Sequence, residues 1–114
     1  MPQYMLLLRD DRKGFNKLSP EEMQKAVEKY WAWRNKPFVV NGNGLDPQTG
    51  RVMQKKNGSV KVTEGPFSES TEVFGGYYTI EAASFDEAVK LSTDHPHLEF
   101  GSVEIREVMV KRPS

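Results

Sequence analysis

An unbroken apolar run, Tyr4 to Leu8, limits the possible folds of this chain more than any other feature. A strand with one wet face alternates apolar and polar residues, whereas a strand covered on both faces reads as continuous apolar sequence. We therefore expect Tyr4–Leu8 to form a central strand of a sheet. Both faces of that sheet then need a cover.

Two helices are predicted from their capping patterns. The first follows Ser19, with Glu22 three residues later, which is the spacing of a capping box. Its apolar residues recur at helical spacing and define one packed face, namely Met23, Ala26, Val27, Tyr30 and Trp31. The second helix follows Ser84, with Glu87 at the matching position, and we expect Pro96 to end it.

The remaining segments read as strands. Asn57-Gly58 lies between two alternating runs, and this dipeptide is typical of a tight hairpin with positive φ angles. Further strands are predicted after Pro37, over Val73–Glu81 and over Ser102–Val110, with a bulge near the end of the last one. The glycine pair Gly75-Gly76 inside a strand predicts a bulge or a close backbone approach rather than a phosphate site, because no helix start follows it.

The predicted order is strand, helix, strand, hairpin, strand, helix, strand. This is an α+β fold with a ferredoxin-like βαββαβ-type plan and an inserted β-hairpin. Two helices cover only one face of the sheet, so a second copy is the simplest cover for the other face. We therefore expect a homodimer that closes the two sheets into a dimeric α/β barrel.

Composition narrows the possible partners. The 114 residues fit one domain, 1–114, and 16 basic residues balance 16 acidic ones, which argues against binding to nucleic acid or an anionic membrane. The chain has no cysteine, which excludes disulfides and thiolate chemistry and fits a cytoplasmic location. The short apolar run near the start lacks the features of a signal peptide or a membrane span.

Several motifs together resemble the YCII-related family, whose hallmark is an Asp-Gly-Pro-Phe motif. They are the opening "YMLLL", the helix start "LSPEE", the loop "NGNGLDP", the stretch "EGPFSESTEVFGGYYTI" and the strand "GSVEIR". The resemblance implies a dimeric α+β barrel with a cleft to which the Gly-Pro-Phe turn contributes. It also implies a link of some members to sigma factors, and a similarity of one branch to lyases that eliminate chloride from chlorinated hydroquinones with a His and Asp pair.

This sequence departs from that family pattern in two places. Glu64 stands where the motif has its aspartate, and no histidine occurs in the first half of the chain, where the lyase branch has its catalytic one. We therefore do not transfer the elimination chemistry to this chain.

Candidate catalytic residues are acids and histidines. Glu64 is either a turn carboxylate that organises its own loop, which we favour, or an acid or base at a cleft, assisted by Glu69. His95 and His97 flank a proline, and we favour a solvated loop for them over a metal pair, since no third ligand is placed by the sequence. A proton-transfer role stays open for either one, and neither a metal nor a cofactor is expected.

Candidate binding residues are aromatic or basic. Arg34 lies near the middle of the first helix's apolar face, so it either extends past the helix end or meets a carboxylate in a cleft. Phe67 is either an anchor for its loop, which we favour, or a stacking platform, and Trp31 and Tyr78 are expected to line a pocket.

Two functions remain open. The first is a small-molecule enzyme of the proton-transfer or lyase type, with a cleft beside the turn at Glu64, and it requires an aromatic-lined pocket with converging polar groups. The second is a non-catalytic dimeric module that binds a small ligand or a regulatory protein, and it requires a shallow cleft and exposed apolar edges.

Overall fold

The computed structural model describes residues 1–10, 17–46, 49–64 and 73–110. Its elements, in chain order, are β1 (Gln3–Asp10), α2 (Pro20–Arg34), β2 (Val39–Gly44), β3 (Arg51–Lys56), β4 (Ser59–Glu64), β5 (Val73–Glu81), α3 (Phe85–Leu91), the 3-10 helix η1 (Pro96–Glu99) and β6 (Ser102–Glu107). Within these residues no helix is long and apolar enough to cross a membrane.

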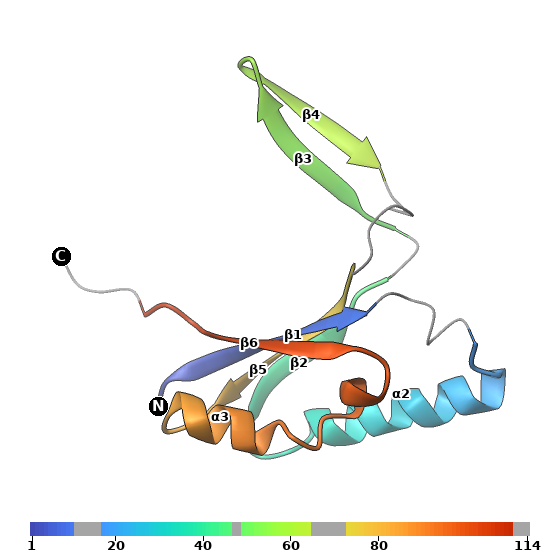
Figure 1. Ribbon diagram of the computed structural model, residues 1–114, viewed down its shortest axis with the longest axis vertical. Coiled ribbons are helices and arrows are strands. Elements are labelled where there is room, and N and C mark those ends of the chain that lie inside the picture. The colour runs from blue at the N-terminus through green and yellow to red at the C-terminus, as the bar shows by residue number, and fades with distance from the viewer. Residues whose placement is uncertain (11–16, 47–48, 65–72, 111–114) are drawn as a thin grey trace.

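Four strands form one antiparallel sheet in the order β2-β5-β1-β6, and β3 pairs with β4 in a separate two-stranded sheet. Without the hairpin, this order is that of a ferredoxin-like fold. The helices lie against one face of the sheet, and the hairpin projects on the other side (Figure 1). The predicted plan and the central place of the first strand are confirmed.

The core lies between this sheet and the helices. Alternate residues of β1 point into it, and β5 contributes from the neighbouring strand. The buried apolar cluster consists of Tyr4, Leu6, Leu8, Trp33, Tyr78, Ile80, Ala82 and Ala88.

Helix α2 begins as predicted but presents a different face. The side chain of Ser19 accepts a hydrogen bond from the Glu22 amide, and the Glu22 carboxylate accepts one from the Ser19 amide, so the capping box is confirmed. The face of α2 that we predicted to pack on the sheet is wrong by part of a turn, because Trp33 is buried whereas Val27 and Trp31 are exposed. The large indole of Trp33 fills the space over the sheet and thereby sets the rotation of the helix.

The glycine pair of β5 has two separate roles. Leu8 pairs with Gly76 and Arg9 with Phe74, which leaves Gly75 as the extra residue of a bulge. A Cβ atom on Gly76 would lie 2.8 Å from the carbonyl oxygen of Asn43 in β2. The predicted bulge and close approach are both present.

The hairpin turn is confirmed, because Asn57 and Gly58 have φ angles of 51° and 80°. At the end of the chain the prediction was wrong. Strand β6 stops at Glu107, and residues 108–110 lie beyond it, so no bulge forms there. The amide of Val108 still donates to the Gln3 carbonyl.

Candidate functional site

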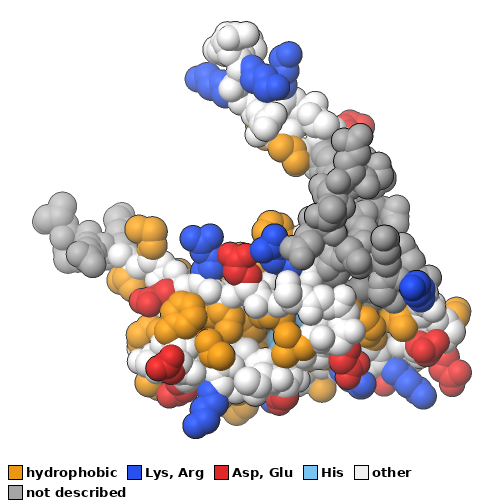
Figure 2. Space-filling model, in the orientation of Figure 1, with side chains coloured by type: hydrophobic (Ala, Val, Ile, Leu, Met, Phe, Trp, Pro, Cys, Tyr) orange, Lys and Arg blue, Asp and Glu red, His pale blue; other side chains and the backbone are white. Residues whose placement is uncertain are grey.

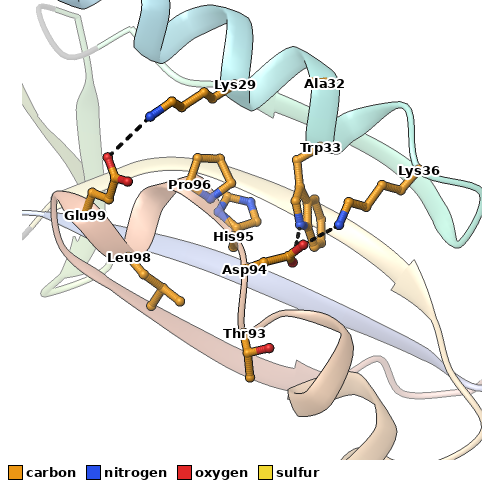
Figure 3. Close-up of a pocket in the computed structure, with 10 residues that line it drawn as sticks. All are labelled: Lys29, Ala32, Trp33, Lys36, Thr93, Asp94, His95, Pro96, Leu98 and Glu99. Atoms are coloured by element: carbon orange, nitrogen blue, oxygen red, sulfur yellow. Dashed lines mark hydrogen bonds and ion pairs between the residues drawn. The ribbon is translucent and has the colours of Figure 1, made fainter.

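A groove of about 470 Å³ lies between the second half of α2 and the segment that joins α3 to β6 (Figure 3). We call this space the groove throughout. Its lining consists of Lys29, Ala32, Trp33, Lys36, Thr93, Asp94, His95, Pro96, Leu98 and Glu99.

The segment under the groove is shaped by two short-range signals. Helix α3 ends at Leu91, and Ser92 closes it with a hydrogen bond from its hydroxyl to the Ala88 carbonyl, 2.8 Å long. We had predicted from the sequence that Pro96 ends this helix, and this prediction was wrong. Pro96 occupies the first turn of η1, where a missing amide hydrogen leaves no hydrogen bond unmade.

His95 is the N-cap of η1 and is almost fully buried, with 2% of its surface exposed. Its ring lies 4.4 Å from the Trp33 ring and 4.7 Å from the Tyr78 ring, measured between centroids. Its Nδ1 accepts a 3.0 Å hydrogen bond from the backbone amide of His97. The prediction of a solvated loop is therefore wrong, because the two histidines fold back under α2.

The pKa of His95 is lowered to about 4, chiefly by burial. The neighbouring His97 and Lys36 also lower this pKa, whereas Asp94 raises it. The ring is thus neutral at pH 7. Since Nδ1 is the acceptor of an amide hydrogen, the single ring proton is on Nε2. This buried Nε2–H group has no hydrogen-bond partner among the described residues.

His97 differs from His95 in how its ring is bonded. It is 1% exposed, and its Nε2 lies 3.0 Å from the Arg9 carbonyl oxygen, which only accepts. Nε2 therefore donates, and Nδ1 accepts the hydroxyl hydrogen of Tyr30 at 2.7 Å. The ring ties α2 and β1 to η1, which is a structural role.

The metal alternative gains no support from this arrangement. In the ranges that the structure describes, no three His, Cys, Asp or Glu side chains gather closely enough to hold an ion.

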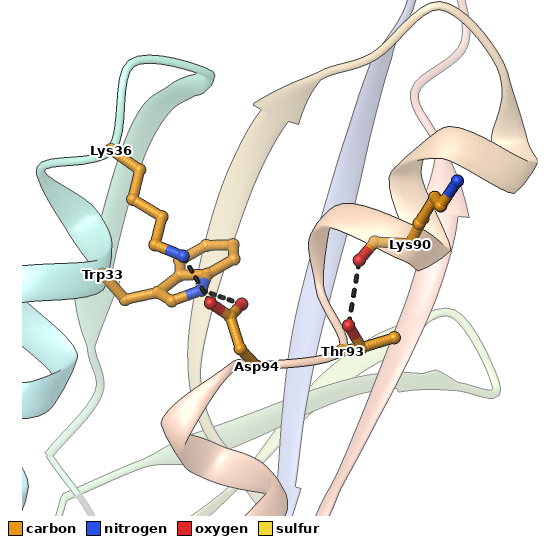
Figure 4. Close-up of polar contacts among 5 residues, drawn as sticks. All are labelled: Trp33, Lys36, Lys90, Thr93 and Asp94. Atoms are coloured by element: carbon orange, nitrogen blue, oxygen red, sulfur yellow. Dashed lines mark hydrogen bonds and ion pairs between the residues drawn. The ribbon is translucent and has the colours of Figure 1, made fainter.

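Asp94 forms the polar rim of the groove (Figure 4). One carboxylate oxygen accepts from the Trp33 indole at 3.0 Å and the other from Lys36, whose ammonium group also lies 5.6 Å from the centre of the Trp33 ring. These two hydrogen bonds hold the pKa of Asp94 below its usual value, and the one from Lys36 has the larger effect. Nearby, the Thr93 hydroxyl donates to the Lys90 carbonyl.

The predicted binding residues fall in two places. Tyr78 is in the core, where its hydroxyl donates to the Tyr30 carbonyl at 3.1 Å, and burial raises its pKa to about 12. Arg34 donates from Nε to the Gly42 carbonyl, and its guanidinium lies 5.0 Å from the centre of the exposed Trp31 ring. Neither Arg34 nor Trp31 lines the groove.

Glu64, the described acid of the Gly-Pro-Phe region, does not line the groove. Glu64 ends β4, is exposed, and lies 3.4 Å from Arg51 on the paired strand, so it does not meet Arg34 as the sequence suggested it could. Phe67 and Glu69 lie outside the described residues.

The sequence-based candidates missed Trp33, Lys36, Asp94 and Tyr30. Trp33 had a usable signal, since it continues the spacing of Met23, Ala26 and Tyr30 along α2. The contacts of Lys36 and Asp94 had none, because they join segments 58 residues apart.

Two comparisons describe what this chain is similar to. An uncharacterized protein, R00369 of Rhizobium meliloti strain 1021, is 28% identical over 96% of this chain and 94% of its own length. The structure of 5-chloro-2-hydroxyhydroquinone dehydrochlorinase from Burkholderia phenoliruptrix AC1100, in complex with 2,5-dihydroxybenzoquinone, matches with a TM-score of 0.44 and 14% identity. That match covers 94% of this chain and 93% of the other.

The family assignment has a firmer basis than either of these single proteins. The model of the YCII-related domain matches residues 3–112, which is nearly the whole chain. The chain therefore belongs to the YCII-related domain family.

Proposed function

We propose that this protein binds a small molecule in the groove and that His95 gives the ligand a hydrogen bond from Nε2. One observation carries the proposal: His95 lines an open groove, and its buried, neutral Nε2–H group has no hydrogen-bond partner among the described residues. A buried donor left unpaired costs about 1–3 kcal/mol. A ligand oxygen that pairs with it recovers part of that free energy.

The lining defines the ligand class. Trp33, Leu98 and Pro96 supply apolar surface, and the rim carries two lysines, each paired with a carboxylate of the lining. A small compound with an apolar body and a carbonyl or carboxylate oxygen matches this combination. A plain hydrocarbon would leave the Nε2–H group unpaired.

An acceptor that reaches Nε2 must displace part of the lining. Two ion pairs of the lining are exposed, Lys36 with Asp94 and Lys29 with Glu99, the second 3.8 Å long. Exposed pairs of this kind contribute about 0–1 kcal/mol each. Separating one of these ion pairs therefore costs little free energy.

For the enzyme alternative, the same geometry selects the role of His95. A neutral ring that already uses Nδ1 as an acceptor polarises a ligand carbonyl by donation, and it is not a base in this arrangement. Proton transfer or elimination would need its base from the ligand's other side. The catalytic roles of Glu64, Glu69 and His97 stay predictions, as does the cytoplasmic location.

The test of this proposal is a thermal-shift series with benzoate, benzamide and toluene on the wild type, His95→Phe and Thr93→Val. Phe keeps an aromatic ring but removes both the Nε2 donor and the Nδ1 acceptor of the His97 amide, and Thr93→Val changes the lining and leaves His95 in place. At ten times the dissociation constant, benzoate or benzamide should stabilise the wild type by about 1.4 kcal/mol, roughly 5 °C.

The same shift is expected in Thr93→Val and none in His95→Phe, whose folding is checked by near-ultraviolet circular dichroism. Equal shifts in the wild type and His95→Phe would show that Nε2 is not the recognition group. No shift with any acceptor compound would remove the groove as a site for this ligand class.

We also propose that the protein is a homodimer. In this dimer the two copies meet through their open sheet faces, meaning the sheet face that lies opposite the helices in each copy. Met5 and Leu7 of β1 and Tyr77 and Thr79 of β5 are cross-strand pairs on this face. Met5, Leu7 and Tyr77 are half-buried, and Thr79 is 7% exposed. A largely apolar patch at the centre of a sheet face without a helix over it is typical of a face that meets another surface. A wild type that sediments as a monomer at micromolar concentration would refute the dimer.

A further inference from the structure

The β3–β4 hairpin carries three of its four apolar side chains on one side. The register pairs Met53 with Val62 and Lys55 with Val60, which brings three apolar side chains to one side. We call Met53, Val60 and Val62 the apolar face of the hairpin; Arg51, Lys55 and Glu64 lie on the same side. The opposite side carries Val52, Gln54, Lys56, Ser59, Lys61 and Thr63.

The apolar face has no cover within the described residues. Met53, Val60 and Val62 are 68%, 57% and 53% exposed, and every residue of both strands is exposed. The hairpin projects clear of the body, with basic side chains gathered near its tip (Figure 2). A two-stranded ribbon alone is at best marginally stable in water, so this one needs a surface to pack on.

Charge indicates which surface fits. Residues 51–64 contain four basic residues, Arg51, Lys55, Lys56 and Lys61, and one acidic residue, Glu64, a net charge of 4 − 1 = +3. The whole chain has a formal net charge of zero, so the rest carries 0 − 3 = −3. A second copy therefore offers a body whose charge complements the hairpin.

We propose that the β3–β4 hairpin is an arm that crosses to a second copy and packs its apolar face on that copy's body. A two-fold axis makes the exchange reciprocal, so both arms are covered at once. The hairpin rises on the same side as the open sheet face, so the arm extends the proposed dimer contact (Figure 1). The inference rests on the proposed homodimer and assigns a second part of its interface.

Sedimentation velocity over a concentration series tests the arm with two double variants. Met53→Ser/Val62→Ser removes a cross-strand pair of the apolar face, and Val52→Ser/Thr63→Ser changes the adjacent pair on the opposite face. The first should weaken dimerisation by about tenfold or more, as loss of central interface side chains does, and the second by less than about twofold. The buried core contains no hairpin residue, so both double variants should keep the near-ultraviolet circular dichroism spectrum of the wild type.

The outcomes separate the arm from the dimer itself. A dimeric wild type whose affinity changes equally in the two variants overturns the arm and leaves the dimer standing. A monomeric wild type overturns both.

Two further measurements complete the test. Hydrogen exchange of the hairpin amides should slow as the protein concentration rises, and protection that is independent of concentration would mean that the arm packs on its own body. A basic β-ribbon also suits nucleic acid. Binding of a short DNA duplex at physiological salt, with dimer affinity unchanged in Met53→Ser/Val62→Ser, would overturn the arm in favour of that partner.

Discussion

Acid should destabilise this protein through His95 in particular. The ring is 2% exposed, packed against Trp33 and Tyr78, and its pKa in the folded state is lowered to about 4. His97 and Lys36 oppose protonation, Asp94 favours it, and burial outweighs all of them. In the unfolded chain the same group titrates near about 6.5.

The direction follows from the two pKa values. Between them the unfolded state binds a proton that the folded state excludes, so stability is complete above about pH 6.5 and falls as the pH is lowered toward 4. With values of about 6.5 and 4, the loss relative to pH 7 is roughly 2 kcal/mol at pH 5 and roughly 3 kcal/mol at pH 4. That is a large share of the stability of an ordinary small domain, about 5–15 kcal/mol.

Urea denaturation at pH 7, 6 and 5, followed by Trp fluorescence, measures this loss. The matched variant is His95→Asn, because Asn keeps an oxygen that can cap the His97 amide and has no proton to titrate. The variant should be less stable than the wild type at pH 7. Between pH 7 and pH 5 its free energy of unfolding should fall by roughly 2 kcal/mol less than that of the wild type. Carboxylates titrate alike in both proteins and cancel in the difference. Equal pH slopes would refute the reasoning that His95 is buried as a neutral ring.

Two further predictions concern packing and capping. Gly42→Ala should lose about 1–3 kcal/mol in urea denaturation, because its Cβ would lie 2.5 Å from the buried Tyr78 ring. Gly44→Ala is the control, since its nearest new contact is at 3.9 Å, and an equal loss there would contradict the steric explanation. Ser19→Ala should lose about 1 kcal/mol with the hydrogen bond to the Glu22 amide, measured by the thermal midpoint, and an unchanged midpoint would mean that the cap contributes nothing.

The fold was predictable where local chemistry decides it. The capping box at Ser19, the Asn57-Gly58 turn and the bulge at Gly75 each depend on neighbours in sequence or on the next strand. The order of these elements then leaves few ways to arrange one sheet. The face of α2 was predicted less well, because spacing alone does not say whether Trp31 or Trp33 enters the core.

The candidate site was predictable only in part, because its contacts are long-range. The Tyr30 hydroxyl meets His97 across 67 residues, and the Arg9 carbonyl meets the same ring across 88. In the sequence the two histidines flank a proline, and such a pattern reads equally well as an exposed loop. Burial came from packing of α2 over the segment, which no local pattern specifies.

The two histidines also show why burial alone does not identify a binding group. Both rings are almost fully enclosed, so exposure does not distinguish them. Hydrogen bonding does, because both ring nitrogens of His97 have protein partners and Nε2 of His95 has none among the described residues. A buried polar atom is normally paired, so a donor that lacks a partner among the described residues, on a side chain that lines the groove, supports the proposal of a ligand there. On this ground the groove at His95, rather than the exposed Glu64, is where a ligand should be sought.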